Sequence, residues 1–367
     1  MNLVIPLRLI VGSICFLYLI LPLAFVSSIR VVMGLDPITT SDYLIGALYS
    51  TWTFLIVFLV PREIVIRSED LEIHRTSAWV LAWLSILASI FVFVSAMHNV
   101  EKLIYFNKTA AHTAYEELNT EYGLRLKYNI LLCLFLPSSI VTGMRGWGVL
   151  FFLAPTVFEV LFSKHNYATH LLIYLFILAW NSRISRRTML ITFSFIVTLL
   201  LGIRFTLYSS FQNNAMQSLA AMLGEFTISW QSIPTALTFS GSTYTGPSEW
   251  YSDILSRAAG LGYGLAGNPV AEAIFYFRNG ALFVLVGAAL GFVLMCRASR
   301  NSTVGSVAML VTTYYMRDCF RTGWSLGFSV YLKSVILFTI ILLASRALQW
   351  TAASRQLRSS MTLERHP

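Results

Sequence analysis

Several ionisable side chains occur where a membrane-spanning sequence would ordinarily carry none. Glu272 and Arg278 lie in an apolar stretch that follows a long polar segment, and Arg204 lies four residues before the end of the predicted helix that leads into that segment. An ionisable group near the bilayer centre is costly and is usually retained for a function. The candidate chemistry is recognition of an anion by arginine and proton transfer by a carboxylate.

Four arginines are the candidates for the anion site: Arg204, Arg278, Arg317 and Arg321. Guanidinium groups that meet at one depth repel one another unless an anion lies between them, and their planar fork suits bidentate binding of phosphate. Arg317 and Arg321 are four residues apart and share a face if their segment is helical. The alternative for each arginine is snorkelling to lipid headgroups.

Two carboxylates accompany these arginines. Glu272 is the candidate general base toward a hydroxyl nucleophile, and Asp318 is the second candidate, although its position between Arg317 and Arg321 favours charge neutralisation. Glu272 and Arg278 are six residues apart, so on one helix they lie on different faces and need other partners. The acidic and histidine residues lack the spacing of a metal cage, so we predict neither a metal nor a cofactor.

The composition identifies the elements that must position these residues. The chain has 367 residues, of which 56% are hydrophobic and only 12% charged, against about 25% charged residues in a soluble domain. We therefore predict an all-α polytopic membrane protein of about ten transmembrane helices. The net charge of +9 comes from arginines in short loops and at the C-terminus. That distribution sets membrane orientation and argues against nucleic-acid binding.

Apolar runs of helical length predict the individual spans. They are Leu7–Ser27, Tyr43–Val60, Ser77–Met97, Tyr128–Thr142, Trp147–Ser163, Tyr167–Trp180, Met189–Tyr208, Glu272–Cys296, Val304–Tyr315 and Phe328–Leu348. The organisation is then N-terminal helices over 1–207, a large helical loop over 208–270, C-terminal helices over 271–350 and a basic tail over 351–367. Arg278 is expected about two turns inside the eighth span. The arginine bias of alternate loops places both termini in the cytoplasm and the large loop outside.

The large outer loop supplies further candidate residues for binding a diphosphate or a glycan. Aromatic rings stack on sugar faces, although the same rings are also typical of an interfacial aromatic belt. The candidates in this loop are Glu225, Trp230, Trp250, Tyr251, Arg257 and Tyr263, and Arg317, Asp318 and Arg321 join them from the later helices.

Three motifs resemble those of the Wzy-type O-antigen polymerases and the related O-antigen ligases. They are Thr142-Gly-Met-Arg-Gly-Trp147, Leu223-Gly-Glu-Phe226, and a glycine-rich approach followed by Ala271-Glu-Ala273 on an entering helix, with Gly280 one or two turns further on. With the Arg317-Asp318 pair the resemblance covers about residues 125–325. Arg204 matches the arginine that these families carry before the large loop.

The resemblance implies a membrane glycosyltransferase of the C type in the bacterial inner membrane, with its active site facing the periplasm. Its donor and acceptor would be oligosaccharides linked to undecaprenyl diphosphate, and its other partners would be membrane lipids and a chain-length regulator of the Wzz type. The ligase branch has a histidine near the position of Glu272, so the polymerase branch is favoured. An O-antigen ligase and a lipid-linked oligosaccharide flippase stay open, as does a multi-pass acyltransferase.

Overall fold

The computed structural model describes residues 2–33, 35–98, 115, 117–144, 146–161, 166–182, 185, 187–188, 191, 194, 226, 228–238 and 267–363. Within these ranges the chain forms thirteen α-helices and one small sheet. Five helical segments are long and apolar enough to cross a membrane: Leu7–Ala24, Arg75–Met97, Leu124–Thr142, Pro269–Ser299 and Trp324–Ala347. The all-α class is confirmed, and these five segments are what a multi-pass membrane protein requires. The predicted span Met189–Tyr208 lies almost entirely outside the described residues.

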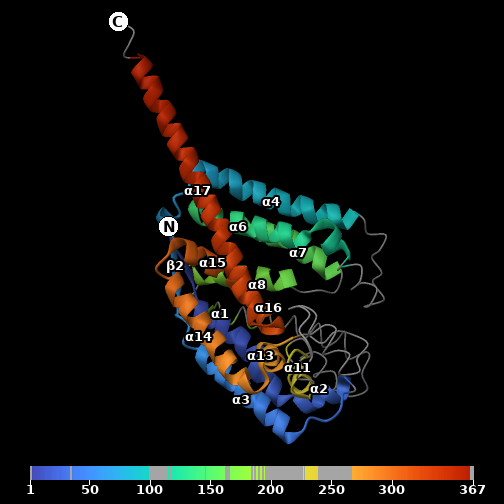
Figure 1. The fold of residues 1–367 in the computed structure, drawn as a ribbon. Coiled ribbons are helices and arrows are strands. Elements are labelled where there is room, and N and C mark those ends of the chain that lie inside the picture. The colour runs from blue at the N-terminus through green and yellow to red at the C-terminus, as the bar shows by residue number, and fades with distance from the viewer. Residues whose placement is uncertain are drawn as a thin grey trace.

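Four helices form the first bundle: α4 (Arg75–His98), α6 (Leu124–Thr142), α7 (Gly148–Leu161) and α8 (Asn166–Trp180) (Figure 1). Aromatic rings fill its interior, and Phe135 stacks on Phe151 with ring centroids 4.5 Å apart. At Gly148 the absence of a side chain lets α7 approach α8, because a Cβ there would lie 2.6 Å from Cζ of Tyr174. Close packing of this kind holds helices together where lipid surrounds them.

The second group begins with α1 (Leu7–Cys15), which continues through the π-helical turn η1 (Phe16–Ile20) and the 3-10 turn η2 (Leu21–Ala24) into α2 (Val26–Met33). It also contains α3 (Thr40–Val57), α11 (Ser232–Thr238), α13 (Pro269–Phe277) and α14 (Ala281–Ser299). Helix α3 packs against η1, α11 and α14, and α13 packs against α11 and α14. The two groups are therefore separate bundles that need a connecting element.

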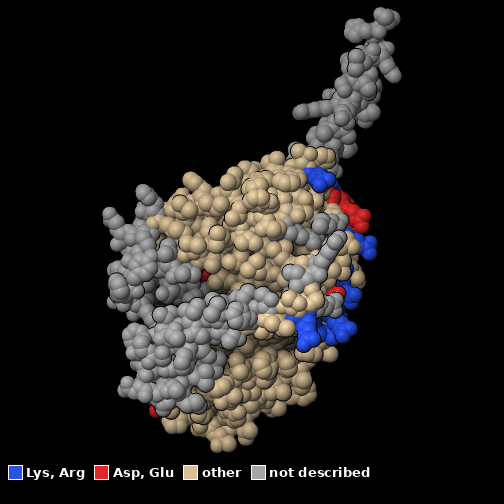
Figure 2. Space-filling view, turned by 180° about the vertical axis from the view of Figure 1, so that it is seen from behind, with Lys and Arg blue, Asp and Glu red and all other residues tan. Residues whose placement is uncertain are grey.

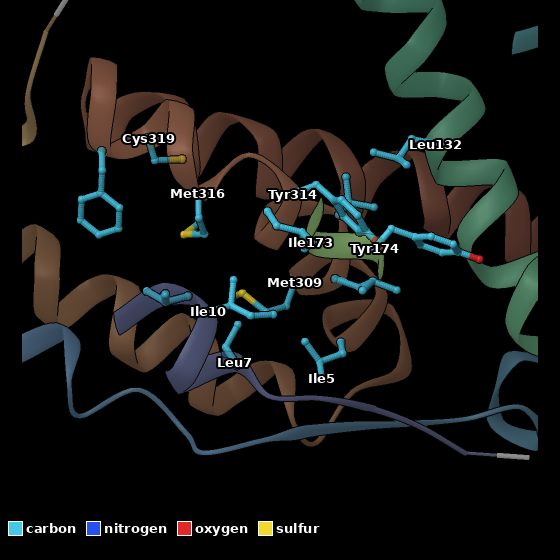
Figure 3. Close-up of a cluster of buried hydrophobic side chains, with 14 of the residues drawn as sticks. Ile5, Leu7, Ile10, Leu132, Ile173, Tyr174, Met309, Tyr314, Met316 and Cys319 are labelled. Atoms are coloured by element: carbon cyan, nitrogen blue, oxygen red, sulfur yellow. The ribbon is translucent and has the colours of Figure 1, made fainter. Parts of the chain in front are cut away.

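That element is a run of three helices, α15 (Thr303–Tyr314), α16 (Met316–Thr322) and α17 (Trp324–Leu363). Every residue of α15 from Gly305 to Tyr314 is buried. Figure 3 shows Met309, Tyr314, Met316 and Cys319 from this run within one apolar cluster that also includes Leu7 and Ile10 of α1. Helix α17 has 40 residues, a length of about 60 Å, and extends well beyond the other helices (Figure 1). The predicted basic tail thus continues this helix as far as Leu363.

A two-stranded antiparallel sheet closes one end of the molecule. Strand β1 (Asn2–Ile5) pairs with β2 (Ile64–Arg67), and the side chain of Asn181 bonds the backbone N–H and C=O of Val4. Exposed arginines surround the sheet, and we call this group the basic rim: Arg62, Arg67, Arg75, Arg297 and Arg300. Figure 2 shows the charged side chains gathered at this end, next to a broad surface free of charge. A wide uncharged surface bounded by arginines is typical of a membrane protein.

Candidate functional site

The candidate site lies at the end of the molecule opposite the basic rim. Helix α14 ends at the rim with Arg297, α15 returns from it, and α16 begins only after Tyr314. The structure therefore brings α13, α16 and the start of α17 together at the far end (Figure 1). These elements carry four of the residues predicted to do chemistry, Glu272, Arg317, Asp318 and Arg321, and Arg278 directly follows α13.

Arg317 is held inside the fold by side chains from three elements. It is 5% exposed. Its Nε donates to the hydroxyl of Tyr18 in η1 at 3.1 Å, and its Nη1 donates to Oδ1 of Asn166 in α8 at 2.6 Å. The same Nη1 lies 3.4 Å from Oδ1 of Asp318. A guanidinium in a water-poor interior needs such partners, so Arg317 joins the two bundles across α16.

The residue that sequence reasoning missed is Glu159, near the end of α7, whose exposed fraction is 0%. Its carboxylate accepts hydrogen bonds from the hydroxyl of Tyr115 at 2.7 Å, from Nδ2 of Asn166 at 2.9 Å and from the backbone N–H of Tyr167. Asn166 therefore bonds both Glu159 and Arg317 through its amide. A single carboxylate in the apolar sequence of α7 was the available signal, because such a group requires a buried partner.

A buried histidine lies beside this network. His170 of α8 is 1% exposed, and its Nδ1 shares a hydrogen bond of 2.8 Å with the hydroxyl of Tyr128. The rings of Tyr167, Tyr314 and Tyr315 pack edge-on against the imidazole. These surroundings are those of a core histidine, with aromatic rings on several sides and almost no exposed surface.

Glu272 docks α13 onto the start of α17. Its Oε1 accepts a hydrogen bond from the hydroxyl of Ser325 at 2.5 Å, and the nearby backbone N–H groups of Trp324 and Ser325 favour its charged form. The first N–H groups of a helix lack partners within that helix and attract negative charge. At Gly323 a Cβ would lie 2.2 Å from Oε2 of Glu272, so only glycine admits this approach.

Arg278 marks a break in the apolar segment Pro269–Ser299. Helix α13 ends at Phe277, Arg278 has φ 43° and ψ −113°, and α14 begins at Ala281. A positive φ at a residue other than glycine costs about 1–3 kcal/mol and persists only where the surroundings impose it. The prediction of one continuous helix over Glu272–Cys296, with Arg278 two turns inside it, is therefore wrong. The apolar pattern continues across the break and hides it.

The break changes the depth at which Arg278 lies. The 19 residues of α14 span about 28 Å, which by itself nearly crosses the ~30 Å hydrocarbon core of a bilayer. Arg278 is exposed at the end of α14 that is distant from the basic rim. It therefore lies at one end of a helix that is nearly long enough to cross a bilayer, and not two turns inside that helix.

Arg321 and Trp230 are the remaining predicted site residues that the structure describes. Arg321 is half-buried in the last turn of α16. Trp230 is completely buried, donates from Nε1 to the hydroxyl of Ser50 at 3.2 Å, and lies so close to Gly46 that a Cβ there would be 2.8 Å from Cζ2 of the indole. The ring of Trp230 thus packs α11 against α3. Six further predicted site residues lie outside the described residues, namely Arg204, Glu225, Trp250, Tyr251, Arg257 and Tyr263.

In the ranges that the structure describes, no three His, Cys, Asp or Glu side chains are grouped so that they could hold a metal ion. The candidate site there consists of arginines, two carboxylates and the hydroxyl and amide groups that hold them. Comparisons with protein-family models, with curated proteins and with solved structures found no match for this chain. Membership of the O-antigen polymerase superfamily therefore stays a prediction from the motifs.

Proposed function

We propose that this protein is a membrane glycosyltransferase that polymerises O-antigen repeat units carried on undecaprenyl diphosphate. The observation that supports it most is the packing of α13, which carries Glu272, against α16, which carries Asp318 and Arg321, at the end of the fold opposite the basic rim, with Arg278 directly after α13. Cations next to a carboxylate at a membrane boundary suit a substrate that combines a diphosphate with sugar hydroxyls. The motif resemblance over about residues 125–325 is the second support.

The orientation follows from the arginine distribution. Arginines concentrate in cytoplasmic loops, so the basic rim would face the cytoplasm and α16 the periplasm of a bacterial inner membrane. Helix α17 returns from α16 to the rim, where Arg346 bonds Glu72, so both chain ends would be cytoplasmic. The site would then face the compartment in which lipid-linked repeat units are joined.

The arginines would have two roles in this reaction. Arg278 at the helix break and Arg321 in α16, together with Arg204, would bind and neutralise the diphosphate as it departs. Arg317 would support them from inside, because Tyr18, Asn166 and Asp318 already bind its guanidinium. Preorganised positive charge of this kind stabilises the transition state because it needs no rearrangement during the reaction.

Glu272 would act as the base. A carboxylate offers about four lone-pair positions, and the Ser325 hydroxyl occupies one of them. A remaining position would accept the proton of the acceptor hydroxyl. The hydroxyl oxygen would form a bond to the anomeric carbon while the bond from that carbon to the diphosphate oxygen breaks, releasing undecaprenyl diphosphate.

Reconstitution tests this function. The purified protein in lipid vesicles is supplied with defined repeat units on undecaprenyl diphosphate, and the products are separated on a gel. A ladder of multiples of one repeat unit with release of undecaprenyl diphosphate is the expected result. Movement of the unmodified substrate across the bilayer without a ladder would instead identify a flippase. Transfer of intact chains to a lipid A core without a ladder would identify a ligase.

A further inference from the structure

The basic rim contains a polar cavity of about 130 Å³ between β2 and the connection from α14 to α15. This volume is several times the ~30 Å³ that one water molecule occupies in the liquid, so the cavity has room for a tetrahedral oxyanion. Its lining comprises Val65, Ile66, Arg67, Asp70, Arg300, Asn301, Ser302, Thr303 and Ser306. It lies at the opposite end of the molecule from Glu272 and α16 and plays no part in the proposed reaction.

Two arginines line the cavity from different elements. Arg67 is the last residue of β2 and Arg300 follows the last residue of α14. Within the described part of the chain, no hydrogen bond or ion pair engages either side chain. Other arginines at this end do have partners, since Arg8 bonds the carbonyl of Val60 and Arg297 that of Leu59. Arg67 and Arg300 therefore point to a ligand that supplies acceptors.

The cavity also presents groups that complement an oxyanion. Ser302 caps α15 by accepting from the N–H of Gly305, and Thr303, the first residue of that helix, belongs to the cavity lining. The N-terminus of a helix adds partial positive charge to that of the two arginines. Asp70 contributes one negative charge, which leaves the lining with a formal excess of one positive charge.

We infer that this cavity binds a phosphate group, held between the forks of Arg67 and Arg300. Phosphate fits because its oxygens accept several charge-assisted hydrogen bonds from arginine at once. The phosphate belongs either to an anionic lipid headgroup or to a free phosphate, since the rim is where headgroups meet the protein. The inference does not depend on the proposed glycosyltransferase activity.

The test measures thermal unfolding of the whole purified protein at constant ionic strength. Inorganic phosphate is titrated into detergent-solubilised protein, and phosphatidylglycerol replaces phosphatidylcholine in nanodiscs in a parallel series. A ligand that binds only the folded state raises the unfolding temperature with concentration. Arg67→Gln and Arg300→Gln should each weaken the apparent affinity by roughly tenfold or more. Arg62→Gln is the matched control, because Arg62 is an exposed rim arginine outside the cavity lining.

Stabilisation by inorganic phosphate that both cavity variants lose identifies a free phosphate as the ligand. Stabilisation by phosphatidylglycerol alone, lost in the same variants and kept in Arg62→Gln, identifies a lipid headgroup. The inference is overturned if neither probe stabilises the wild type, or if Arg62→Gln loses as much affinity as the cavity variants. Either result leaves the proposed polymerase activity unaffected.

Discussion

The carboxylates of Glu159 and Glu272 are both held by hydrogen bonds, yet they differ in their access to solvent. Glu159 is completely buried, with donors from Tyr115, Asn166 and Tyr167. Glu272 is only partly buried, with donors from the first residues of α17. The first carboxylate can bind nothing outside the protein. The carboxylate of Glu272 anchors α17 and is still partly exposed. We therefore interpret Glu159 as a structural residue and Glu272 as the residue that can react with a substrate.

The largest effect on the stability of the protein is expected from removing the buried carboxylate of Glu159. Glu159→Ala leaves the Tyr115 hydroxyl, the Asn166 amide and the Tyr167 N–H buried without their acceptor, at a cost of about 3–5 kcal/mol. Glu159→Gln retains one acceptor oxygen and should cost clearly less. Denaturant-induced or thermal unfolding followed by tryptophan fluorescence measures both. Equal stability of the alanine variant and the wild type would show that the network contributes nothing.

The next largest effect is expected on the rate of polymerisation, when the carboxylate of Glu272 is replaced. Glu272→Gln keeps an oxygen for the N-terminus of α17 but cannot take up a proton at neutral pH. The variant should stay folded while its polymerisation rate falls by about a hundredfold or more, the usual contribution of a general base. Rates from reconstituted vesicles check this, with unfolding measured on the same sample. A rate within a few-fold of the wild type would leave Glu272 with the anchoring role alone.

A smaller effect is expected at the contact between α13 and α17. Gly323→Ala would bring its Cβ into collision with the carboxylate of Glu272 and place alanine at a φ of 156°, and we expect a loss of about 1–3 kcal/mol from overpacking and backbone strain. Glu272→Ala should relieve the part of that loss that comes from the collision. Gly287→Ala in α14 is the control, because no atom lies within 4 Å of the Cβ added there. Additive losses in the double variant would mean that the two residues do not interact.

The smallest effect on stability is expected from the exposed ion pair between Arg346 and Glu72, which serves as a reference for Glu159 and Glu272. Nε of Arg346 bonds Oε2 of Glu72 at 2.6 Å in full contact with solvent, and this hydrogen bond lowers the pKa of Glu72. The stabilisation is therefore present above the ordinary pKa of glutamate and is lost as the pH falls through the lowered value. Arg346→Gln should leave the unfolding temperature at pH 7 almost unchanged. A large drop there would show that the loop is held to α17 by this pair.

The sequence was sufficient to predict the membrane class and most helix positions. Ser77–Met97 corresponds to Arg75–His98 in α4, and Tyr167–Trp180 ends with α8. Apolar composition over twenty residues leaves few other structures. The predicted spans Tyr128–Thr142 and Trp147–Ser163 leave a short connection, and Gly143 in that connection adopts a left-handed φ of 74° between α6 and α7.

The details of the site were harder to predict because they depend on contacts between distant segments. The role of Glu159 depends on hydrogen bonds from Tyr115 and Asn166, which lie in other helices. The helix break at Arg278 is invisible in an apolar pattern that continues on both sides of it. Pairing of β1 with β2 joins residues about sixty positions apart, and four-residue strands give too short a pattern to recognise.

The most direct test of the account is the polymer yield of Arg278→Gln in vesicles that contain undecaprenyl-diphosphate-linked repeat units. Arg75→Gln is the control, because it removes an exposed arginine from the basic rim at the other end of the fold. The account predicts that Arg278→Gln stays folded and forms at least about a hundredfold less polymer, as expected when a group that stabilises transition-state charge is removed, and that Arg75→Gln forms normal ladders. Equal ladders from both variants would contradict a diphosphate site at the α13–α16 end of the protein.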